Sequence, residues 1–404
     1  MAAIRFISHL EASGYGLAGI AYVRGLVNAG VPVQWVPLLR EGRTVRPWRH
    51  GSDPLPPAVD GSRGRDAALA DIHALLAATV APVAHDTVVI HAVPEYLSQF
   101  LEPGRRNVAY TTWETDRLPS HWLPLLRQMQ AILVPCRFNA EVFVRSGVTA
   151  PVHVVPHIRR HEWNPFTPEE VAARRQALQI PADHFVFYSI ADWWGGRKNI
   201  EGMLAAYTRA FSRDDPVSLV LKTSEVASAG RPLFERVPAL ERMQQLLAAF
   251  AAGKGAPLPH IALIASNQVM GRDIDLLHET GDAYVSLSRG EGWGLGAFDA
   301  ASRGTPVLMP NWGGVTDFLG DDWLGAIPYR LTAADVWPID EPSFHSSQRW
   351  ADADIPAAAA LMQRAVAEPA AFRAAAAAQA ESIANRFAEG VVTRRLLSGL
   401  YAAD

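Results

Sequence analysis

The chain has 404 residues, a length that exceeds one ordinary hydrophobic core and predicts two domains of about 150–200 residues each. Its content of 49% hydrophobic and 19% charged residues is typical of a folded protein and excludes a disordered one. A net charge of −4 argues against a general nucleic-acid binder, and the single cysteine, Cys136, excludes an internal disulfide framework and fits a reducing compartment.

Short apolar strands alternate with helical patterns along the first half of the chain. We expect strands at IRFISH, VPVQWVPL, TVVIHAV, NVAYTTW, AILVP and VHVVP, with helices over Leu17–Ala29, Asp66–Thr79, Ser120–Met129 and Arg137–Ser146. Such alternation predicts βαβ units and a parallel sheet. Residues 38–64 are rich in Pro, Gly and Arg and lack periodicity, so we expect a long surface loop there.

The same pattern restarts in the second half. Strands are expected at HFVFYSIAD, VSLVLKT, HIALIAS, AYVSLS and PVLMP, with helices over Asn199–Phe211, Leu233–Ala252, Asp273–Thr280 and Leu295–Arg303. The alanine-rich end, Ala357–Ala402, predicts further helices. The fold class is therefore α/β, with doubly wound domains at 1–156 and 157–375 and C-terminal helices at 376–404. Because open α/β sheets bind ligands beyond the carboxyl ends of their strands, functional residues are expected in strand-to-helix turns.

The first such turn is Gly14-Tyr15-Gly16-Leu17-Ala18-Gly19, a GxGxxG between a strand and a helix. A dinucleotide site would need an acid at the end of the second strand, and Glu41 lies beyond the expected end of that strand. The alternatives are a turn whose amides face an anionic group and a purely structural turn.

A second turn, Gly195-Gly196-Arg197-Lys198-Asn199, places two cations just before a helix. Positive side chains disfavour a helix N-terminus, whereas unpaired amides there attract anions. We therefore expect a phosphate site, against the alternative of a solvated charge pair.

The third turn is RGEGWG, which follows the strand AYVSLS and opens the helix LGAFDAASRG. The glycines would let backbone amides approach a ligand, and Glu291 and Asp299 are spaced to hold hydroxyls at two points along it. The alternative is that Glu291 is a surface acid and Asp299 a helix-dipole acid. The turn Gly313-Gly314 follows the next strand and is expected at the same cleft. No cluster of Cys and His suggests a zinc site.

The stretch EGWGLGAFDAASRGTPV resembles the E-x7-E element of family 4 glycosyltransferases, whose usual form is EGFGLPxxEAMAxGxPV. The GRKN and GGVTDF turns stand in the expected order around it, and SGYG matches the family's first-domain glycine loop. TTWETDRLPSHWLPLL, AILVPCRFNAEVFVRSGV and VHVVPH look like the tail of that first domain. The resemblance covers almost the whole chain. It implies the GT-B fold, in which two Rossmann-like domains face each other across a cleft and C-terminal helices cross back to the first.

The resemblance implies a retaining enzyme of glycan or surface-polysaccharide assembly that moves a hexose or deoxyhexose from a UDP-, GDP- or dTDP-linked donor. No metal or other cofactor is implied. Arg197 and Lys198 would neutralise the leaving diphosphate, Glu291 would bind hydroxyls of the donor sugar, and Asp299 would hold the ribose. Donor contacts are expected from Gly14, Gly16, Ser266, Val269, Gly292, Trp293, Gly294, Leu295, Gly296 and Asp299, and acceptor-side contacts from Tyr15, His91, Trp113 and Glu114.

The sequence departs from the family pattern at three points. The second acid is Asp299 where the family has Glu, which shortens its reach to the ribose by one methylene. Trp113 or Glu114 stands where the family often has a histidine, and Pro156-His157-Ile158 replaces the usual PNG of the hinge.

Other functions stay open at this stage. They are an inactive nucleotide-sugar-binding protein, a GT-B epimerase or phosphorylase, and a NAD-dependent oxidoreductase that would rest on GYGLAG alone. We expect a cytoplasmic protein, because no signal peptide or membrane-spanning run is visible, with peripheral contact to the inner face of the membrane left open. The acceptor could be a growing polysaccharide, a lipid-linked glycan or a small molecule, and the sequence leaves the oligomeric state undetermined.

Overall fold

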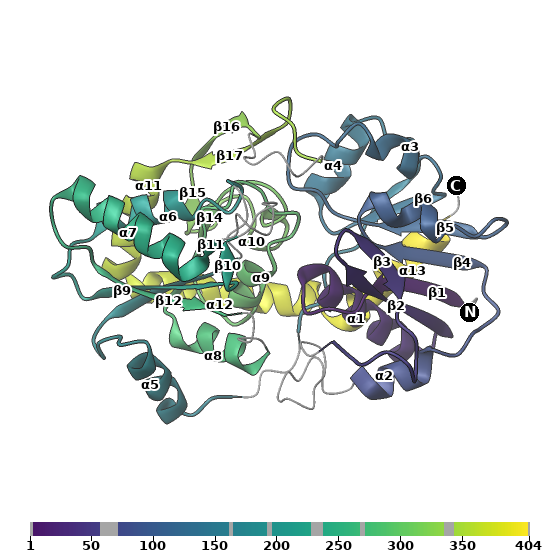
Figure 1. The fold of residues 1–404 in the computed structure, drawn as a ribbon, viewed down its shortest axis with the longest axis horizontal. Coiled ribbons are helices and arrows are strands. Elements are labelled where there is room, and N and C mark those ends of the chain that lie inside the picture. The colour runs from purple at the N-terminus through teal and green to yellow at the C-terminus, as the bar shows by residue number, and fades with distance from the viewer. Residues whose placement is uncertain are drawn as a thin grey trace.

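Two α/β domains, each built on one β-sheet, lie side by side in the computed structural model (Figure 1). The first-half domain is purple and blue in Figure 1, and the second-half domain is teal and green. The structure describes residues 3–56, 72–160, 165–191, 196–227, 237–266, 271–334 and 343–402. Among these residues, no helix is long and apolar enough to span a membrane.

The first sheet has seven strands in the order β3-β2-β1-β4-β5-β6-β7, all parallel except β3. Strand β4 is buried at every position, as expected for a parallel strand that helices cover on both faces. The strands are β1 (Ile4–His9), β2 (Val33–Glu41), β3 (Thr44–Pro47), β4 (Thr87–His91), β5 (Arg106–Tyr110), β6 (Ala131–Val134) and β7 (Val152–Val154).

The second sheet has six parallel strands in the order β12-β9-β8-β13-β14-β15. Two short antiparallel pairs accompany it, β10 with β11 and β16 with β17. The strands are β8 (Phe185–Ile190), β9 (Val217–Thr223), β10 (Val226–Ala227), β11 (Val237–Pro238), β12 (His260–Ala265), β13 (Ala283–Val285), β14 (Val307–Pro310), β15 (Ala326–Ile327), β16 (Tyr329–Ala333) and β17 (Arg349–Ala353).

Every predicted helix is present, and three further helices, α5, η2 and α10, were not predicted. Helix α5 was missed although Thr167 and Glu170 form a reciprocal capping box at its start. The predicted residues 66–71 and 233–236 lie outside the described part of the chain. The helices are α1 (Gly14–Asn28), α2 (Ile72–Thr79), 3₁₀ helix η2 (Pro94–Gln99), α3 (Trp122–Leu126), α4 (Arg137–Arg145), α5 (Pro168–Ala177), α6 (Ile200–Ala210), α7 (Ala239–Lys254), α8 (Arg272–Thr280), α9 (Leu295–Ser302), α10 (Thr316–Leu319), α11 (Ile355–Ala367), α12 (Pro369–Arg386) and α13 (Glu389–Tyr401).

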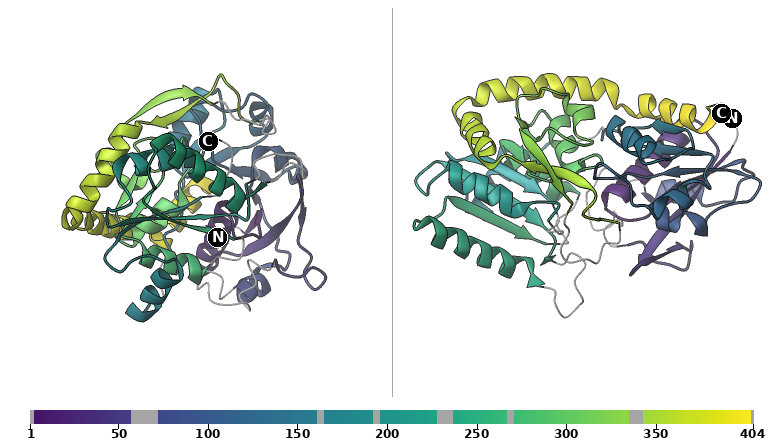
Figure 2. Two further views of the ribbon diagram at one scale, coloured as in Figure 1. Left: turned by 60° about the vertical axis from the view of Figure 1, so that its left-hand side comes forward. Right: turned by 90° about the horizontal axis from the view of Figure 1, so that it is seen from above.

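The C-terminal helices cross from the second domain to the first (Figure 2). Helix α12 packs on α9 and α10, whereas α13 packs on α1, β6 and β7. Nε of Arg106 in β5 donates to the carbonyl of Leu400 at 3.0 Å, which fixes the end of α13 to the first sheet. The predicted boundary at 375/376 falls inside α12. Because α12 packs on the second domain and α13 on the first, the chain crosses between the domains after α12. The predicted GT-B arrangement, with helices that return to the first domain, is confirmed.

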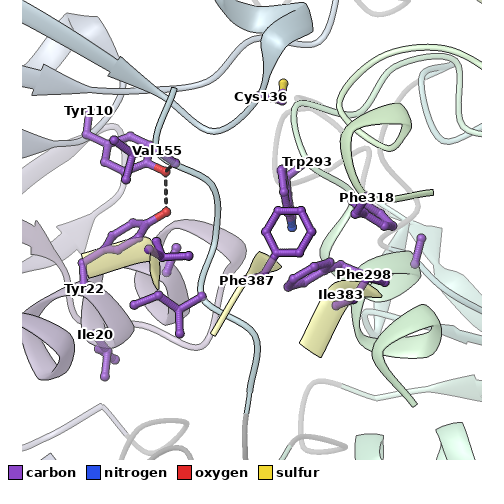
Figure 3. Packing of buried hydrophobic residues seen from close by; sticks show 14 of the residues in the cluster. Ile20, Tyr22, Tyr110, Cys136, Val155, Trp293, Phe298, Phe318, Ile383 and Phe387 are labelled. Carbon is purple, nitrogen blue, oxygen red and sulfur yellow. Dashed lines mark hydrogen bonds between the residues drawn. The ribbon is translucent and has the colours of Figure 1, made fainter. Parts of the chain in front are cut away.

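One hydrophobic cluster is continuous across the two domains (Figure 3). Tyr22 and Tyr110 belong to the first domain, and the ring of Trp293 lies in the second domain, 5.4 Å from that of Phe387, which follows α12. The imidazole of His157, in the linker between the domains, stacks on Trp293 with ring centroids 5.3 Å apart. Shared apolar burial therefore holds the two domains together.

One prediction about an irregular segment needs correction, and one hairpin was missed. Residues 38–64 were expected to be a loop, but β2 continues to Glu41 and pairs with β3 through residues 38–47. Arg46 stabilises this hairpin, because its guanidinium contacts Glu41 at 2.6 Å and Asp53 at 2.6 Å. Residues 57–64 lie outside the described ranges. The hairpin of β16 and β17 was not predicted.

Candidate active site

The turn RGEGWG runs from the end of the second-domain strand β13 to the start of α9. Gly294 is the N-cap of α9 and has φ 85°, a left-handed conformation that glycine adopts without steric cost. No side chain caps this helix end. The first amides of α9, from Leu295 and Gly296, therefore stand at a helix N-terminus suited to an anion.

Two cations approach the same turn from the segment before α6. Nζ of Lys198 lies 2.6 Å from Oε1 of Glu291, and Nη1 of Arg197 donates to the carbonyl of Gly290 at 2.7 Å. Asn199 follows them as the N-cap of α6 and accepts a hydrogen bond from Gly202. The structure thus brings the predicted Arg197, Lys198 and Glu291 together, although they are about ninety residues apart in sequence. Gly195 of this motif lies outside the described residues.

Glu291 is a largely buried carboxylate, with 16% of its side chain exposed. Burial by itself would raise its pKa, but the charges of Lys198 and Arg197 outweigh burial and the net pKa is lowered. Glu291 is therefore ionised at neutral pH and can only accept hydrogen bonds.

The glycines of RGEGWG serve interdomain packing. A Cβ on Gly290 would lie 2.0 Å from the carbonyl oxygen of Glu114, and one on Gly292 would lie 1.9 Å from Oγ1 of Thr112. Cys136 also donates to the carbonyl of Gly292 at 3.1 Å. The turn is bare because the segment that follows the first-domain strand β5 packs directly on it.

The second glycine turn, Gly313-Gly314, packs against the backbone of the first turn, RGEGWG. A Cβ on Gly314 would lie 2.1 Å from the carbonyl oxygen of Gly292, and Gly313 has φ 87°. The amide of Gly314 donates to the carbonyl of Glu291 at 2.8 Å. The predicted joint position of the two turns is therefore observed, and Gly313-Gly314 holds the backbone that carries Glu291.

Asp299 lies one turn into α9 and is buried, with 7% of its side chain exposed. Its Oδ2 is 3.6 Å from Nη1 of Arg160. The other terminal nitrogen of Arg160, Nη2, lies 3.3 Å from Oδ2 of Asp275 in α8. Asp275 in turn contacts Arg303 at 2.6 Å. Sequence reasoning missed this network, because nothing in the linker marks Arg160 as a partner of α9.

On the first-domain side, Glu114 lies at the site and Trp113 does not. Oε1 of Glu114 is 3.5 Å from Nη1 of Arg197. The indole of Trp113 is 3% exposed, packs on Trp122 at 4.7 Å, and donates to Thr115. Of the two residues that could replace the family's histidine, the structure favours Glu114 and corrects the expectation for the side chain of Trp113.

The predicted acceptor-side residues Tyr15 and His91 are also engaged inside the protein. The Tyr15 hydroxyl accepts from the amide of Thr112 at 3.2 Å and pairs with Thr111 at 3.1 Å. His91 is 2% exposed, and burial lowers its pKa well below the usual value, so it is neutral. Its position among aromatic rings makes His91 a core residue, which corrects the expectation of substrate contact.

The GxGxxG turn begins α1, and most of its groups are engaged in contacts within the first domain. The amide of Gly16 donates to Oγ of its N-cap, Ser13, at 3.2 Å. A Cβ on Gly19 would lie 2.7 Å from Oγ of Ser8, whereas one on Gly14 would meet nothing within 4 Å. Only Gly14 is open, and Glu41 is held by Arg46, so no acid is free at the end of β2 for the ribose of a dinucleotide.

Ser266 and Val269, two of the predicted donor contacts, have different outcomes. Ser266 follows β12, and its amide donates to the carbonyl of Thr223 at the end of β9 at 3.1 Å. Val269 lies outside the described residues. Asn139 was missed by sequence reasoning: it is fully buried, and its Oδ1 accepts from the hydroxyl of Thr112 at 2.7 Å and from the amide of Trp113 at 3.1 Å. It therefore fixes the first-domain turn that carries Glu114.

Comparisons with known proteins agree with this arrangement. Residues 271–395 match the family model described as Family 4 Glycosyltransferase in conflict systems. Comparison with curated protein sequences gave no match.

Several solved structures are similar over their full length. Anabaena HepE in complex with UDP and glucose has 12% sequence identity and a TM-score of 0.64, and the match covers 100% of each chain. Sucrose-phosphate synthase from Thermosynechococcus elongatus has 17% identity and a TM-score of 0.62, again over 100% of each chain. A glycosyltransferase from Rickettsia africae ESF-5 has 13% identity and a TM-score of 0.63, with 100% of this chain and 99% of that chain covered.

At such low identity, these structures establish the shared fold. The family match adds the second-domain segment that contains Glu291, Asp299 and α9. Together they confirm the predicted resemblance to family 4 glycosyltransferases of the GT-B fold and the prediction of a glycosyltransferase.

Proposed function

We propose that this chain transfers a hexose or deoxyhexose from a nucleotide-diphosphate sugar to an acceptor hydroxyl, with retention of anomeric configuration and without a metal. The observation that carries the proposal is the convergence of Arg197, Lys198 and Glu291 at the uncapped N-terminus of α9. A polysaccharide or another glycan is the proposed acceptor class.

The chemistry follows from the charges at this point. Breaking the bond between sugar and diphosphate places negative charge on the leaving phosphate oxygens. Arg197 and Lys198 would take up that charge together with the amides of Leu295 and Gly296. The ionised Glu291 would accept hydrogen bonds from donor-sugar hydroxyls, in exchange for part of its contact with Lys198. The leaving phosphate would then accept the proton of the attacking hydroxyl, so no enzymic nucleophile is required.

Asp299 is the proposed ribose contact, and Arg160 orients its side chain for that role. The guanidinium 3.6 Å away fixes the shorter side chain of Asp299. The carboxylate of Asp299 would accept a hydrogen bond from a ribose hydroxyl.

The first experiment is a thermal-shift screen of the purified chain against UDP, GDP, dTDP and ADP. A ligand at one hundred times its Kd stabilises the native state by about 2.7 kcal/mol. UDP-glucose is the first full donor to test, because an Anabaena HepE structure contains it. Failure of all four nucleotides to raise Tm would contradict the proposal.

Product analysis then separates the alternatives. Incubation with the matched donor and EDTA, with and without glycan acceptors, should give an acceptor-dependent product with the donor's anomeric configuration. An inverted product would refute retention, and loss of turnover in EDTA would refute metal independence. Interconversion of donors without acceptor would identify an epimerase, dependence on inorganic phosphate a phosphorylase, and nucleotide binding without turnover an inactive binder.

A further inference from the structure

One segment of the second domain reaches across to the first domain beside the candidate site. This segment, the clasp, comprises Ser343 to Asp352: the residues that lead into β17 and the first four residues of that strand. Figure 1 shows β16 and β17 at the top of the second domain, on the same side of the molecule as α3 and α4.

The clasp is anchored in the first domain by packing and by hydrogen bonds. The ring of Phe344 stacks on Trp113 at 4.9 Å with an interplanar angle of 28°. Oγ of Ser343 donates to Oε1 of Glu95 at 3.1 Å. Arg349 pairs with Asp116: its amide donates to the Asp116 carboxylate at 2.6 Å, and its carbonyl accepts from the Asp116 amide at 3.0 Å.

The same clasp holds the start of the glycine turn in the second domain. The amide of Ala351 donates to the carbonyl of Arg289 at 2.9 Å. Asp352 accepts from Nε of Arg289 at 2.8 Å, which fixes the side chain as well. Arg289 immediately precedes Gly290, the residue on which the carbonyl of Glu114 packs.

The residues that the clasp holds surround Glu114 in sequence. Trp113 and Asp116 are both fixed by it, and Glu114 between them faces Arg197 at 3.5 Å. We propose that the clasp positions Glu114 of the first domain against Arg197 of the second for sugar transfer, with Phe344 as the positioning residue. This inference rests on the proposed function.

The physical reason is that catalysis at a domain interface needs both walls in register. The two domains supply opposite halves of the site, and a misplacement of about 1 Å can cost about a hundredfold in rate. In the proposed function, the groups that bind the nucleotide, which are Arg197, Lys198 and helix α9 with Asp299, all belong to the second domain. Loss of the clasp should therefore affect the transfer step more than nucleotide binding.

The test is Phe344→Ala, with Phe344→Tyr as the conservative variant. We expect kcat to fall about tenfold or more in Phe344→Ala and to be restored in Phe344→Tyr, with the Kd for UDP by calorimetry unchanged. Tyr329→Ala, at a half-exposed aromatic on the same hairpin, is the matched control and should keep wild-type kcat. Wild-type kcat in Phe344→Ala would overturn the proposal, as would parallel loss of UDP affinity and kcat.

Two further measurements show that Phe344 acts through Glu114. In a double-mutant cycle, Phe344→Ala should add little to the loss already caused by Glu114→Gln, whereas additive effects would overturn the proposal. Hydrogen exchange should rise in Phe344→Ala at residues 113–116 and 289–291 together, and unchanged exchange there would overturn it. The exchange measurement needs no turnover, so failure of the proposed function and failure of the clasp are distinguishable.

Discussion

At the scale of single residues, the Lys198–Glu291 ion pair is the contact on which the site most depends. Lys198→Met removes the cation that opposes the leaving diphosphate, and we expect kcat to fall about 10²–10³-fold, as for loss of one stabilising donor elsewhere. Steady-state kinetics with the matched donor measure this. Lys254→Met is the control, because Lys254 donates to backbone carbonyls at the end of α6, away from Glu291. A kcat within twofold of wild type would contradict the role of Lys198.

The same pair gives a prediction for stability and pH. The pKa of Glu291 in the folded protein is lowered from its usual value of 4.5, so its stabilisation is present above that pH and is lost as pH falls through the folded pKa. Lys198→Met leaves the carboxylate partly buried beside Arg197 alone, at a cost of about 3 kcal/mol. The Tm difference between wild type and Lys198→Met should be larger at pH 7 than at pH 4.

Replacing the carboxylate provides the check on that assignment. In the Lys198→Met background, a further Glu291→Gln substitution removes the titrating group. The double variant should differ from Glu291→Gln by an amount that no longer changes between pH 4 and pH 7. A difference that keeps the same pH dependence would show that another group titrates.

Asp299 is one of the three points at which the sequence departs from the pattern of family 4 glycosyltransferases, and its role is separable from that of Glu291. Asp299→Asn keeps the shape but removes the charge that faces Arg160 at 3.6 Å. We expect the donor KM to rise about tenfold with kcat little changed, because the ribose is remote from the breaking bond. An unchanged KM would refute the ribose role and leave Asp299 as a partner of Arg160 only.

At the scale of elements, the bare backbone of RGEGWG can be tested by filling it. Gly292→Ala places a Cβ 1.9 Å from Oγ1 of Thr112, so the two domains must separate and transfer should fall about a hundredfold. Thr112→Ala removes that oxygen and should partly restore Gly292→Ala. Gly290→Ala meets the backbone of Glu114 at 2.0 Å, which no trimming of a side chain can relieve. Gly253→Ala in α7, where a Cβ would meet nothing within 4 Å, is the control.

Most strands and helices of both sheets were predictable, because buried parallel strands and amphipathic helices leave clear periodic patterns. The segments that sequence reasoning missed lack such patterns. Residues 38–41 continue β2 because Arg46 and its acidic partners fold the following turn back. The β16–β17 hairpin was missed because its outer residues, Tyr329 and Leu331, are exposed and carry no burial signal.

The candidate site was predictable as a set of turns but not as a set of contacts. The positions of Arg197, Lys198 and Glu291 follow from where strands end in an open α/β sheet. The contacts of Arg160 with Asp299, and of Asn139 with Thr112, join segments far apart in the chain. Trp113 and His91 were predicted as ligand residues because of their places at strand ends, yet both side chains are buried in the protein.

At the scale of the whole molecule, the C-terminal helix α13 packs on the first domain and so connects it to the helices of the second domain. Leu396 of α13 is fully buried with Val392 and Leu400 in the cluster that spans both domains. Leu396→Ala should cost about 2–5 kcal/mol of stability through the cavity it leaves. Val144→Ala, on the exposed face of α4, is the control and should stay within about 0.5 kcal/mol of wild type.

The same variant distinguishes the tasks of the two domains. Because α13 packs on α1, β6 and β7, the loss in Leu396→Ala should appear as early unfolding and faster hydrogen exchange of the first sheet. The second sheet, which carries Arg197, Lys198 and Glu291, should keep its protection and its affinity for UDP. Transfer should fall as the first domain loosens, because Glu114 must still meet Arg197 across the cleft. Equal loss of protection in both sheets would mean that the two domains unfold as one cooperative unit.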